Sequence, residues 1–325
     1  MIPLIIIAGP TAVGKSDVAF ELAKRLNTEI ISADSMQVYR YFNIGTAKPS
    51  PERQKEIQHH LIDIVNPDEG FSAGDFNERA FKIAEELNRK GEIPVVAGGT
   101  GLYIKALIND LGCGVRKDEE ARERIKSEFK ELGEDAMYEK LKRVDPQAVN
   151  KIHPKDRYRI ERALEVYYST GKPLSEFHRE ERRGTRDERR KNERFEVKYF
   201  VLNMDRKLLY KKIEDRVDKM ISAGLLQETE KILNMGYDKN LKPFQSLGYL
   251  QMIKYLDGKM DFDSAVQEIK KETRRFAKRQ LTWFRGVKDA VWIDVSEAKD
   301  IEEISSQIYP VRKAKTFSRG LQDVS

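Results

Sequence analysis

Eight consecutive residues near the start of the chain have the types and spacing of a phosphate-binding loop. They match the pattern G-x-x-x-x-G-K-S/T, after a short apolar run and before a helical pattern. Glycines let the backbone N–H groups converge on phosphate oxygens, and the following helix adds its positive N-terminal end. Lys15 supplies a point charge, and the Ser16 hydroxyl can hold a metal ion. The loop consists of Gly9, Pro10, Thr11, Ala12, Val13, Gly14, Lys15 and Ser16. It predicts that a polyphosphate binds here, but it does not identify which one.

Two further residues follow expected strands, so they should lie beside this loop. Asp34 comes just after the strand 29–32, where a carboxylate can act as a general base or orient a metal-bound water. It can equally cap a helix. Thr100 stands in a Gly98–Gly101 turn after the strand 93–97, where its hydroxyl can contact a phosphate or a nucleophile. A tight turn with an incidental threonine explains the same pattern.

A typical phosphate-loop NTPase has a second strand that ends in an Asp supporting magnesium. Here the strand 93–97 ends in Gly-Gly-Thr, which weakens an ATPase interpretation and leaves Asp34 as the well-placed carboxylate. Arg216 is notable in the second half of the chain because it falls on the apolar stripe of a helix. A buried arginine needs a partner, and that partner is either a core carboxylate or an anionic phosphate group.

Two segments combine basic and aromatic residues at helical spacing, namely 156–164 and 274–285. Such side chains can hold RNA phosphates and stack on bases. A solvated helix face with core aromatic residues is the more common explanation for either segment alone. The His59-His60 pair has no cysteine or third histidine nearby, so we do not expect a metal site there.

Composition limits the class of protein. The 325 residues are 39% hydrophobic and 35% charged, with a net charge of +6 and a sequence pI near 9.0. The small basic excess is only a weak indication of a polyanionic partner. No stretch is apolar and long enough to cross a bilayer. The single cysteine, Cys113, excludes an internal disulfide and fits a reducing compartment, so we expect a cytoplasmic protein without a membrane partner.

The order of expected elements predicts an α/β fold, with a parallel sheet flanked by helices. Strands are expected at 4–8, 29–32, 93–97, 199–202 and 291–295, and helices at 16–26, 76–88, 207–235 and 265–284. Residues 1–111 and 203–310 would form the core, 112–202 a helical insertion, and 311–325 a loosely ordered tail. In such sheets ligands bind at the carboxyl ends of strands. The phosphate loop, the 33–37 segment and the 98–101 turn should therefore share one cleft.

The motifs together resemble one family, the bacterial tRNA dimethylallyltransferases, also called tRNA isopentenyltransferases. The resemblance covers about residues 3–290. In chain order it rests on GPTAVGKS, ISADSMQVYR, IGTAKP, HHLID, GGTGLY, RALEV followed by STGKPL, and RQLTWFR.

The resemblance implies a phosphate-loop kinase-like core whose helical insertion grips the anticodon stem-loop. It implies transfer of a dimethylallyl group from dimethylallyl diphosphate to the exocyclic N6 amine of the adenosine 3′ of the anticodon in tRNA. Asp34 would be the general base. Lys15, Arg216 and a Mg²⁺ ion near Ser16 would stabilise the leaving diphosphate, with Thr11 and Thr100 lining the reactive site. The absent second carboxylate is then expected, because no phosphoanhydride bond is cleaved.

The resemblance and the basic helices together give the expected RNA contacts. These are Asp34, Ser35, Met36, Gln37, Thr100, Arg122, Tyr158, Arg159, Ile160, Glu161, Arg162, Arg279, Gln280, Trp283 and Arg285. The target base must leave its stack to react. We expect the protein to act as a monomer.

Three alternatives remain open at this point. A small-molecule kinase would use the same loop, but it lacks its usual second aspartate. An isopentenyltransferase acting on free adenine nucleotides would not need the arginine-bearing helices or the insertion. A non-catalytic RNA-binding regulator would not need an intact phosphate loop.

Overall fold

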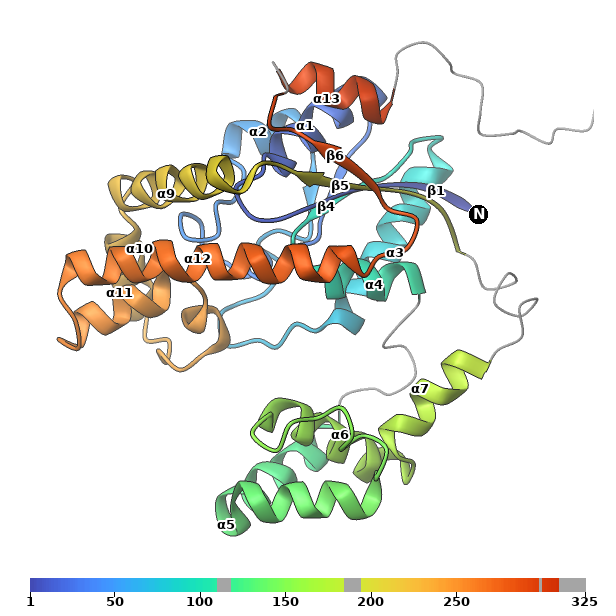
Figure 1. Ribbon diagram of the computed structural model, residues 1–325, viewed down its shortest axis with the longest axis vertical. Coiled ribbons are helices and arrows are strands. Elements are labelled where there is room, and N and C mark those ends of the chain that lie inside the picture. Colours follow the sequence, from blue (N-terminus) through green and yellow to red (C-terminus); the bar gives the residue numbers. More distant parts are fainter. Residues whose placement is uncertain (110–117, 184–193, 298–299, 310–325) are drawn as a thin grey trace, which may run out of the picture. The chain divides into compact units, whose positions relative to one another are not determined.

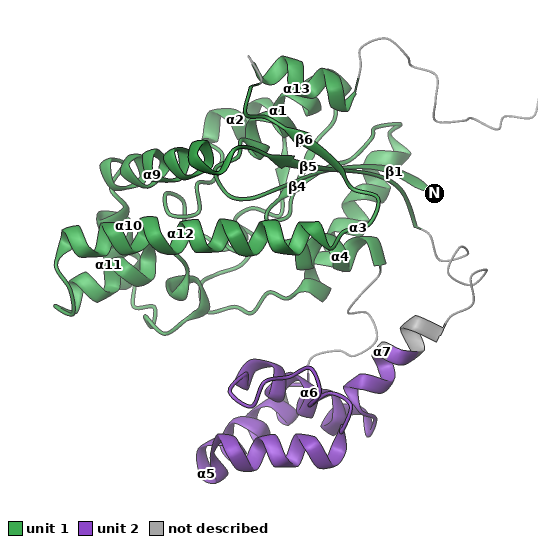
Figure 2. Ribbon diagram, in the orientation of Figure 1, with its two compact units in different colours: residues 1–110, 194–325 green, residues 111–193 purple. Residues whose placement is uncertain are grey.

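The computed structural model describes residues 1–109, 118–183, 194–297 and 300–309. The chain divides into two compact units, one made of residues 1–110 and 194–325 and the other of residues 111–193 (Figure 2). The second boundary differs from the expected one at 202/203 because strand β5 (Phe195–Asn203) pairs with the first strand of the sheet. The expected tail, 311–325, lies outside the described residues.

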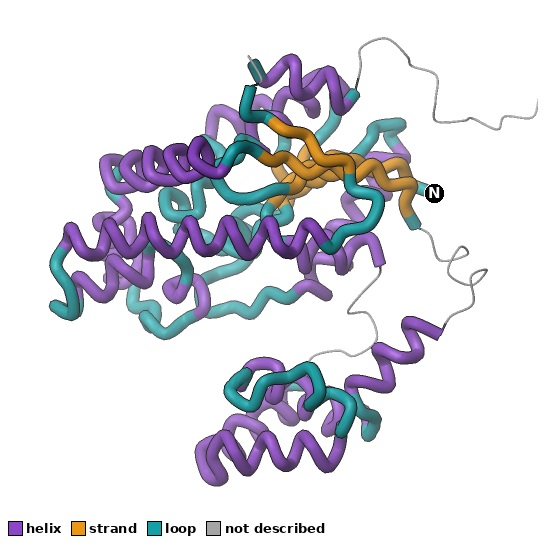
Figure 3. Tube along the Cα trace, in the orientation of Figure 1, coloured by secondary structure: helices purple, strands orange, loops and turns teal. Residues whose placement is uncertain are grey.

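A six-stranded parallel sheet forms the centre of the first unit (Figure 3). Its order is β3-β2-β4-β1-β5-β6. This confirms the α/β prediction. Besides β5, the strands are β1 (Ile2–Ala8), β2 (Ile30–Ser32), β3 (His59–His60), β4 (Val95–Gly98) and β6 (Val291–Asp294). Strand β3 was not among the expected strands, because its two residues are too few to show a hydrophobic period.

Helices cover both faces of this sheet (Figure 1). Alternate residues of β1 separate the two layers, because Leu4 and Ile6 join one hydrophobic cluster and Ile5 and Ile7 join the other. The first cluster includes residues of α3 (Ala73–Arg89), α4 (Gly101–Asn109), α10 (Leu225–Asn234), α11 (Tyr249–Leu256) and α12 (Phe262–Arg285). The second includes residues of α1 (Lys15–Leu26), α9 (Arg206–Ser222) and α13 (Ile301–Ile308). Two short helices, α2 (Pro51–Glu56) and η1 (Lys242–Gln245), lie in the connections.

The single helix expected over 207–235 is wrong. Two helices, α9 and α10, replace it, and the break falls at Gly224, whose φ of 96° is left-handed. A glycine adopts this conformation at little cost. The apolar period continues on both sides of the break, so periodicity alone did not reveal it.

The second unit is helical, with α5 (Glu119–Val144), α6 (Arg157–Thr170) and α7 (Leu174–Arg183). A third hydrophobic cluster fills it, built around residues such as Phe129, Leu141 and Leu164. Within the described parts of the chain, no helix combines the length and apolar character needed to cross a bilayer.

Candidate active site

The phosphate loop connects β1 to α1 at the carboxyl edge of the sheet. Gly9 is needed there because a Cβ would lie 2.6 Å from the carbonyl oxygen of Leu202. Gly14 is left-handed, with a φ of 104°, and immediately precedes the helix. In the described chain, the N–H groups of Gly14, Lys15 and Ser16 donate to no acceptor within the protein. They are therefore available at the positive end of α1, as an anion site requires.

Two cations meet beside this loop. The Lys15 ammonium donates to the carbonyl of Pro10 at 2.7 Å. Burial and, second, the charge of Arg216 lower the pKa of Lys15 to about 7, and Asp34 opposes this shift. Burial also lowers the pKa of Arg216, again opposed by Asp34. These three side chains, from separate segments, therefore lie within electrostatic reach of one another.

Arg216 comes from the buried side of α9, next to Ile213 and Val217. Among the described residues its guanidinium makes no hydrogen bond or ion pair, and Asp34 interacts with it only at longer range. A desolvated guanidinium facing an ammonium is unfavourable unless an anion joins them. This arrangement favours the anion-binding interpretation of Arg216 over a core ion pair.

The Asp34 carboxylate caps the turn that follows β2. One carboxylate oxygen, Oδ1, accepts the N–H of Met36 at 2.8 Å and that of Gln37 at 3.2 Å, so Asp34 does cap the turn after β2. The neighbouring Ser35 N–H donates to the hydroxyl of Thr100 at 3.0 Å. The turn of Asp34 and the turn of Thr100 are thus joined directly.

The glycines around Thr100 leave space for neighbouring atoms of the protein. A Cβ on Gly98 would lie 2.1 Å from the carbonyl oxygen of Ala33. One on Gly99 would lie 2.3 Å from Nε2 of Gln280, and one on Gly101 2.1 Å from the indole nitrogen of Trp283. The residue that follows β2 and the side chains of α12 therefore approach the backbone of this turn closely.

Two glutamines expected to contact RNA point inward instead. Gln280 is 7% exposed, and its amide bonds to the phosphate loop and to Gly99. Gln37 is 9% exposed, accepts the hydroxyl of Ser32 and donates to the carbonyls of Thr46 and Ala47. Because their amides are satisfied internally, both side chains position loops. Neighbouring Met36 is half-buried against the core.

Part of the surface of α12 next to Gln280 is exposed and has side chains of the kind expected to contact RNA. Phe276 and Trp283 are 37% and 43% exposed, although neither would be expected at a surface. Arg279 lies between them at helical spacing, 5.8 Å from the Phe276 ring centre, and Arg285 is also exposed. Among the described residues neither arginine has a carboxylate partner. The exposed surface of α12 therefore offers two arginines without a carboxylate partner among the described residues, and Arg279 lies beside the Phe276 ring.

In the second unit, the residues of α6 divide between surface and core. Tyr158 is 76% exposed and Arg159 is also exposed. Ile160 is fully buried in the hydrophobic cluster, so its side chain cannot touch RNA in this fold. Glu161 pairs with Arg157 at 2.7 Å.

Arg122 and Arg162 both bind the buried carboxylate of Glu165, at 2.9 and 3.1 Å. These ion pairs connect α5 with α6. Each guanidinium therefore uses part of its hydrogen-bonding capacity inside the unit.

The described residues contain no group of three or more His, Cys, Asp or Glu side chains that could hold a metal. Ser16 is exposed at the start of α1, and its hydroxyl has no hydrogen-bond partner among the residues that the structure describes. A Mg²⁺ ion commonly takes few protein ligands and several from phosphates and water. The residues present therefore fit a metal that arrives with a phosphate-bearing ligand.

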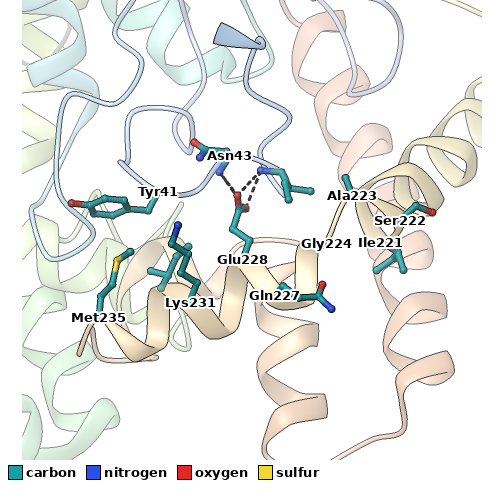
Figure 4. A pocket seen from close by; sticks show the side chains of 12 residues that line it. Tyr41, Asn43, Ile221, Ser222, Ala223, Gly224, Gln227, Glu228, Lys231 and Met235 are labelled. Atoms are coloured by element: carbon teal, nitrogen blue, oxygen red, sulfur yellow. Dashed lines mark hydrogen bonds between the residues drawn. The ribbon is translucent and has the colours of Figure 1, made fainter.

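A separate hollow of about 650 Å³ lies at the junction of α9 and α10 (Figure 4). It is lined by none of the expected site residues. Glu228 crosses it to accept the N–H groups of Asn43 and Ile44, and Tyr249 donates to the same carboxylate. Together they hold the IGTAKP segment in place.

Neither this support of the IGTAKP segment nor the role of Lys48 within it was expected from the sequence. The Lys48 ammonium bonds to the carbonyl of Tyr39 and to Asp63 and is nearly inaccessible. Burial lowers its pKa, against opposing contributions from Asp63 and, more weakly, Asp34. The IGTAKP motif was the available signal, but nothing local indicated its partners.

Comparison with known proteins gives a consistent result. The family model described as IPP transferase matches residues 37–287. A tRNA dimethylallyltransferase of Syntrophobacter fumaroxidans is 48% identical over 91% of this chain and 84% of its own length. One of Acetivibrio thermocellus is 46% identical over 93% of this chain and 94% of its own length. These alignments span most of the chain.

Solved structures agree. A full-length tRNA isopentenylpyrophosphate transferase of Bacillus halodurans is 39% identical, with a TM-score of 0.67 over 95% of this chain and 96% of its own. A eukaryotic dimethylallyltransferase acting on tRNA is 28% identical, with a TM-score of 0.76 over 94% of this chain and 77% of its own.

Proposed function

The chain belongs to the IPP transferase family, and from that membership we propose that it prenylates tRNA. A dimethylallyl group passes from dimethylallyl diphosphate to the N6 amine of the adenosine 3′ of the anticodon. The products are N6-isopentenyladenosine and diphosphate.

The observation that carries this proposal is the pair of cations at the phosphate loop. Lys15 and Arg216 are desolvated close to each other, and the free N–H groups of 14–16 lie at the end of α1. Each cation disfavours the other until a polyanion binds. When the C–O bond breaks, negative charge grows on the departing diphosphate, and these preorganised donors stabilise it without having to rearrange.

The acceptor side is formed by Asp34 and Thr100. The adenine N6 lone pair attacks C1 of the dimethylallyl group, and the bond from C1 to the diphosphate oxygen breaks with its electron pair leaving on the diphosphate. The N6 proton then passes to the Asp34 carboxylate. Oδ1 is held by two backbone N–H groups, so the carboxylate is fixed in orientation, as a general base requires.

A metal ion would complete the leaving-group side. Ser16 is the residue that would hold Mg²⁺ through its free hydroxyl, together with oxygens of the diphosphate. When bound, the ion would neutralise part of the charge that develops on the leaving group.

The RNA would be held by exposed cations and rings on each unit. On α12 these are Phe276, Arg279, Trp283 and Arg285, and on α6 they are Tyr158 and Arg159. Phosphate contacts by these exposed arginines would supply affinity, and the exposed rings can stack on bases of an unpaired loop. Reaction on tRNA fits the expected cytoplasmic location, and a monomer stays the expected state.

The test is product analysis. Purified protein is incubated with Mg²⁺, labelled dimethylallyl diphosphate and unmodified tRNA, and the RNA is digested to nucleosides. Parallel tubes contain AMP in place of tRNA, or ATP with no prenyl donor. We expect label in N6-isopentenyladenosine from tRNA only.

Two outcomes would overturn the proposal. Label on AMP but not on tRNA would make the protein a nucleotide-prenylating enzyme. ATP turnover without transfer of label to tRNA would make it an ATPase or a small-molecule kinase. Asp34→Asn serves as the matched control, because an Asn oxygen can still accept the N–H groups of Met36 and Gln37 while the base is lost.

A further inference from the structure

Gln280 connects two loops that are distant in sequence. Its Oε1 accepts the N–H of Thr11 at 2.8 Å, and its Nε2 donates to the carbonyl of Gly99 at 3.0 Å. One loop is the phosphate loop, and the other carries Thr100. The side chain is 7% exposed, so water does not compete strongly for these bonds.

The chemistry of the two partners specifies the residue type. Thr11 presents a donor and Gly99 presents an acceptor, so the bridge needs one acceptor and one donor in a single short side chain. A primary amide has both, whereas a carboxylate has only acceptors and an ammonium only donors. Gly99 lacks a side chain at the point where Nε2 approaches, and a Cβ there would lie 2.3 Å from it.

A second contact of the same helix reinforces the bridge. Trp283 stands three residues after Gln280 on α12 and packs its indole over Gly101, immediately after Thr100. Ala277, three residues before Gln280, is buried in the hydrophobic cluster that contains α1. One helix therefore contacts the turn of Thr100 and is anchored near the helix that follows the phosphate loop.

On the basis of the proposed function, we propose that Gln280 is a positioning residue that locks the phosphate loop to the Thr100 turn. It fixes where the diphosphate sits relative to the acceptor amine. Because the Thr11 N–H donates to Gln280, it does not donate a hydrogen bond to the diphosphate. The N–H groups of residues 14–16 donate to the diphosphate instead. Gln280 itself touches neither substrate.

The test compares Gln280→Met with Gln251→Met. Methionine matches glutamine in length but makes neither hydrogen bond. Gln251 is a matched control because it is 1% exposed and also bonds through both ends of its amide, to Gly248 and Glu268, away from both loops. In Gln280→Met each substrate keeps its own contacts, but their relative placement loosens. We expect kcat to fall roughly 10- to 100-fold, because misplacement of about 1 Å costs that much, while KM for dimethylallyl diphosphate changes less than about threefold.

Hydrogen–deuterium exchange tests the bridge independently of the reaction. We expect faster exchange in the peptides that contain Thr11 and Thr100 in Gln280→Met without ligand, and no change there in Gln251→Met. If Gln280→Met does not fold, Gln280→Asn replaces it. An amide one methylene shorter can serve one loop only, so it should lower kcat by a smaller factor.

An unchanged kcat in a folded Gln280 variant would overturn the inference. The inference would also be overturned if the Gln280 and Gln251 variants lost kcat in proportion to their losses in melting temperature. If the wild-type protein did not prenylate tRNA, the proposed function would fail, whereas the exchange result would still decide whether the bridge couples the loops.

Discussion

Binding of diphosphate should draw a proton onto Lys15. The pKa of this lysine falls from its ordinary 10.5 to about 7 in the ligand-free site, first through burial and second through Arg216. At pH 8 about one molecule in ten would carry the proton, so binding an anion that needs the charge should take up about 0.9 proton. The drop in pKa corresponds to at most about 5 kcal/mol of lost stabilisation of the charged form.

The sign of the pH dependence follows from the direction of this shift. Between pH 7 and 10.5 the unfolded chain holds the lysine proton more tightly than the ligand-free fold does. Stability of the free protein should therefore rise with pH across that window. Affinity for diphosphate should instead weaken, by about tenfold per pH unit above 7, because each binding event must first protonate Lys15.

Titration calorimetry with inorganic diphosphate at pH 8, in buffers of different ionisation enthalpy, measures the proton uptake. Lys15→Arg is the matched control, because a guanidinium stays charged at every pH used. The ligand's own protonation contributes equally to both proteins, so the difference isolates the lysine. Equal uptake by the two proteins would refute the reasoning that Lys15 is neutral in the free site.

Three further substitutions test individual residues. Asp34→Asn should lower single-turnover prenylation by about 10²- to 10⁴-fold with tRNA binding retained, and a loss under tenfold would remove Asp34 as the base. Arg279→Ala should weaken tRNA binding and reduce the slope of log K against log salt concentration by about one unit. Arg275→Ala is the control and should have a smaller effect, because Arg275 is already paired with Glu272. Equal salt slopes for the two variants would contradict this expectation. Ile160→Ala should destabilise the helical unit by about 2–5 kcal/mol in urea unfolding, and weaker RNA binding at unchanged stability would make Ile160 a contact residue instead.

Local sequence was sufficient for the phosphate loop and the main elements. The pattern of Gly9–Ser16 needs only a strand before it and a helix after it, and both are encoded by adjacent residues. Helix α12 was expected over 265–284 and spans Phe262–Arg285, because its apolar period is strong. The break at Gly224 was missed because tertiary packing, rather than the period, decides whether a helix continues through a glycine.

Tertiary structure decided which residues work together. Thr11 and Gln280 are 269 positions apart, and Lys15 lies far from Arg216 in the sequence. No periodicity or local motif encodes such pairs, because they depend on how α9 and α12 pack on the sheet. Tertiary packing also turned Gln37 and Gln280 inward in the first unit and Ile160 inward in the helical unit. The family resemblance and the basic helices made each an expected contact residue, but burial and hydrogen-bond partners exist only in the folded chain. The sequence by itself therefore determined what chemistry was available, and the fold determined which side chains reach the ligand and which hold the loops in place.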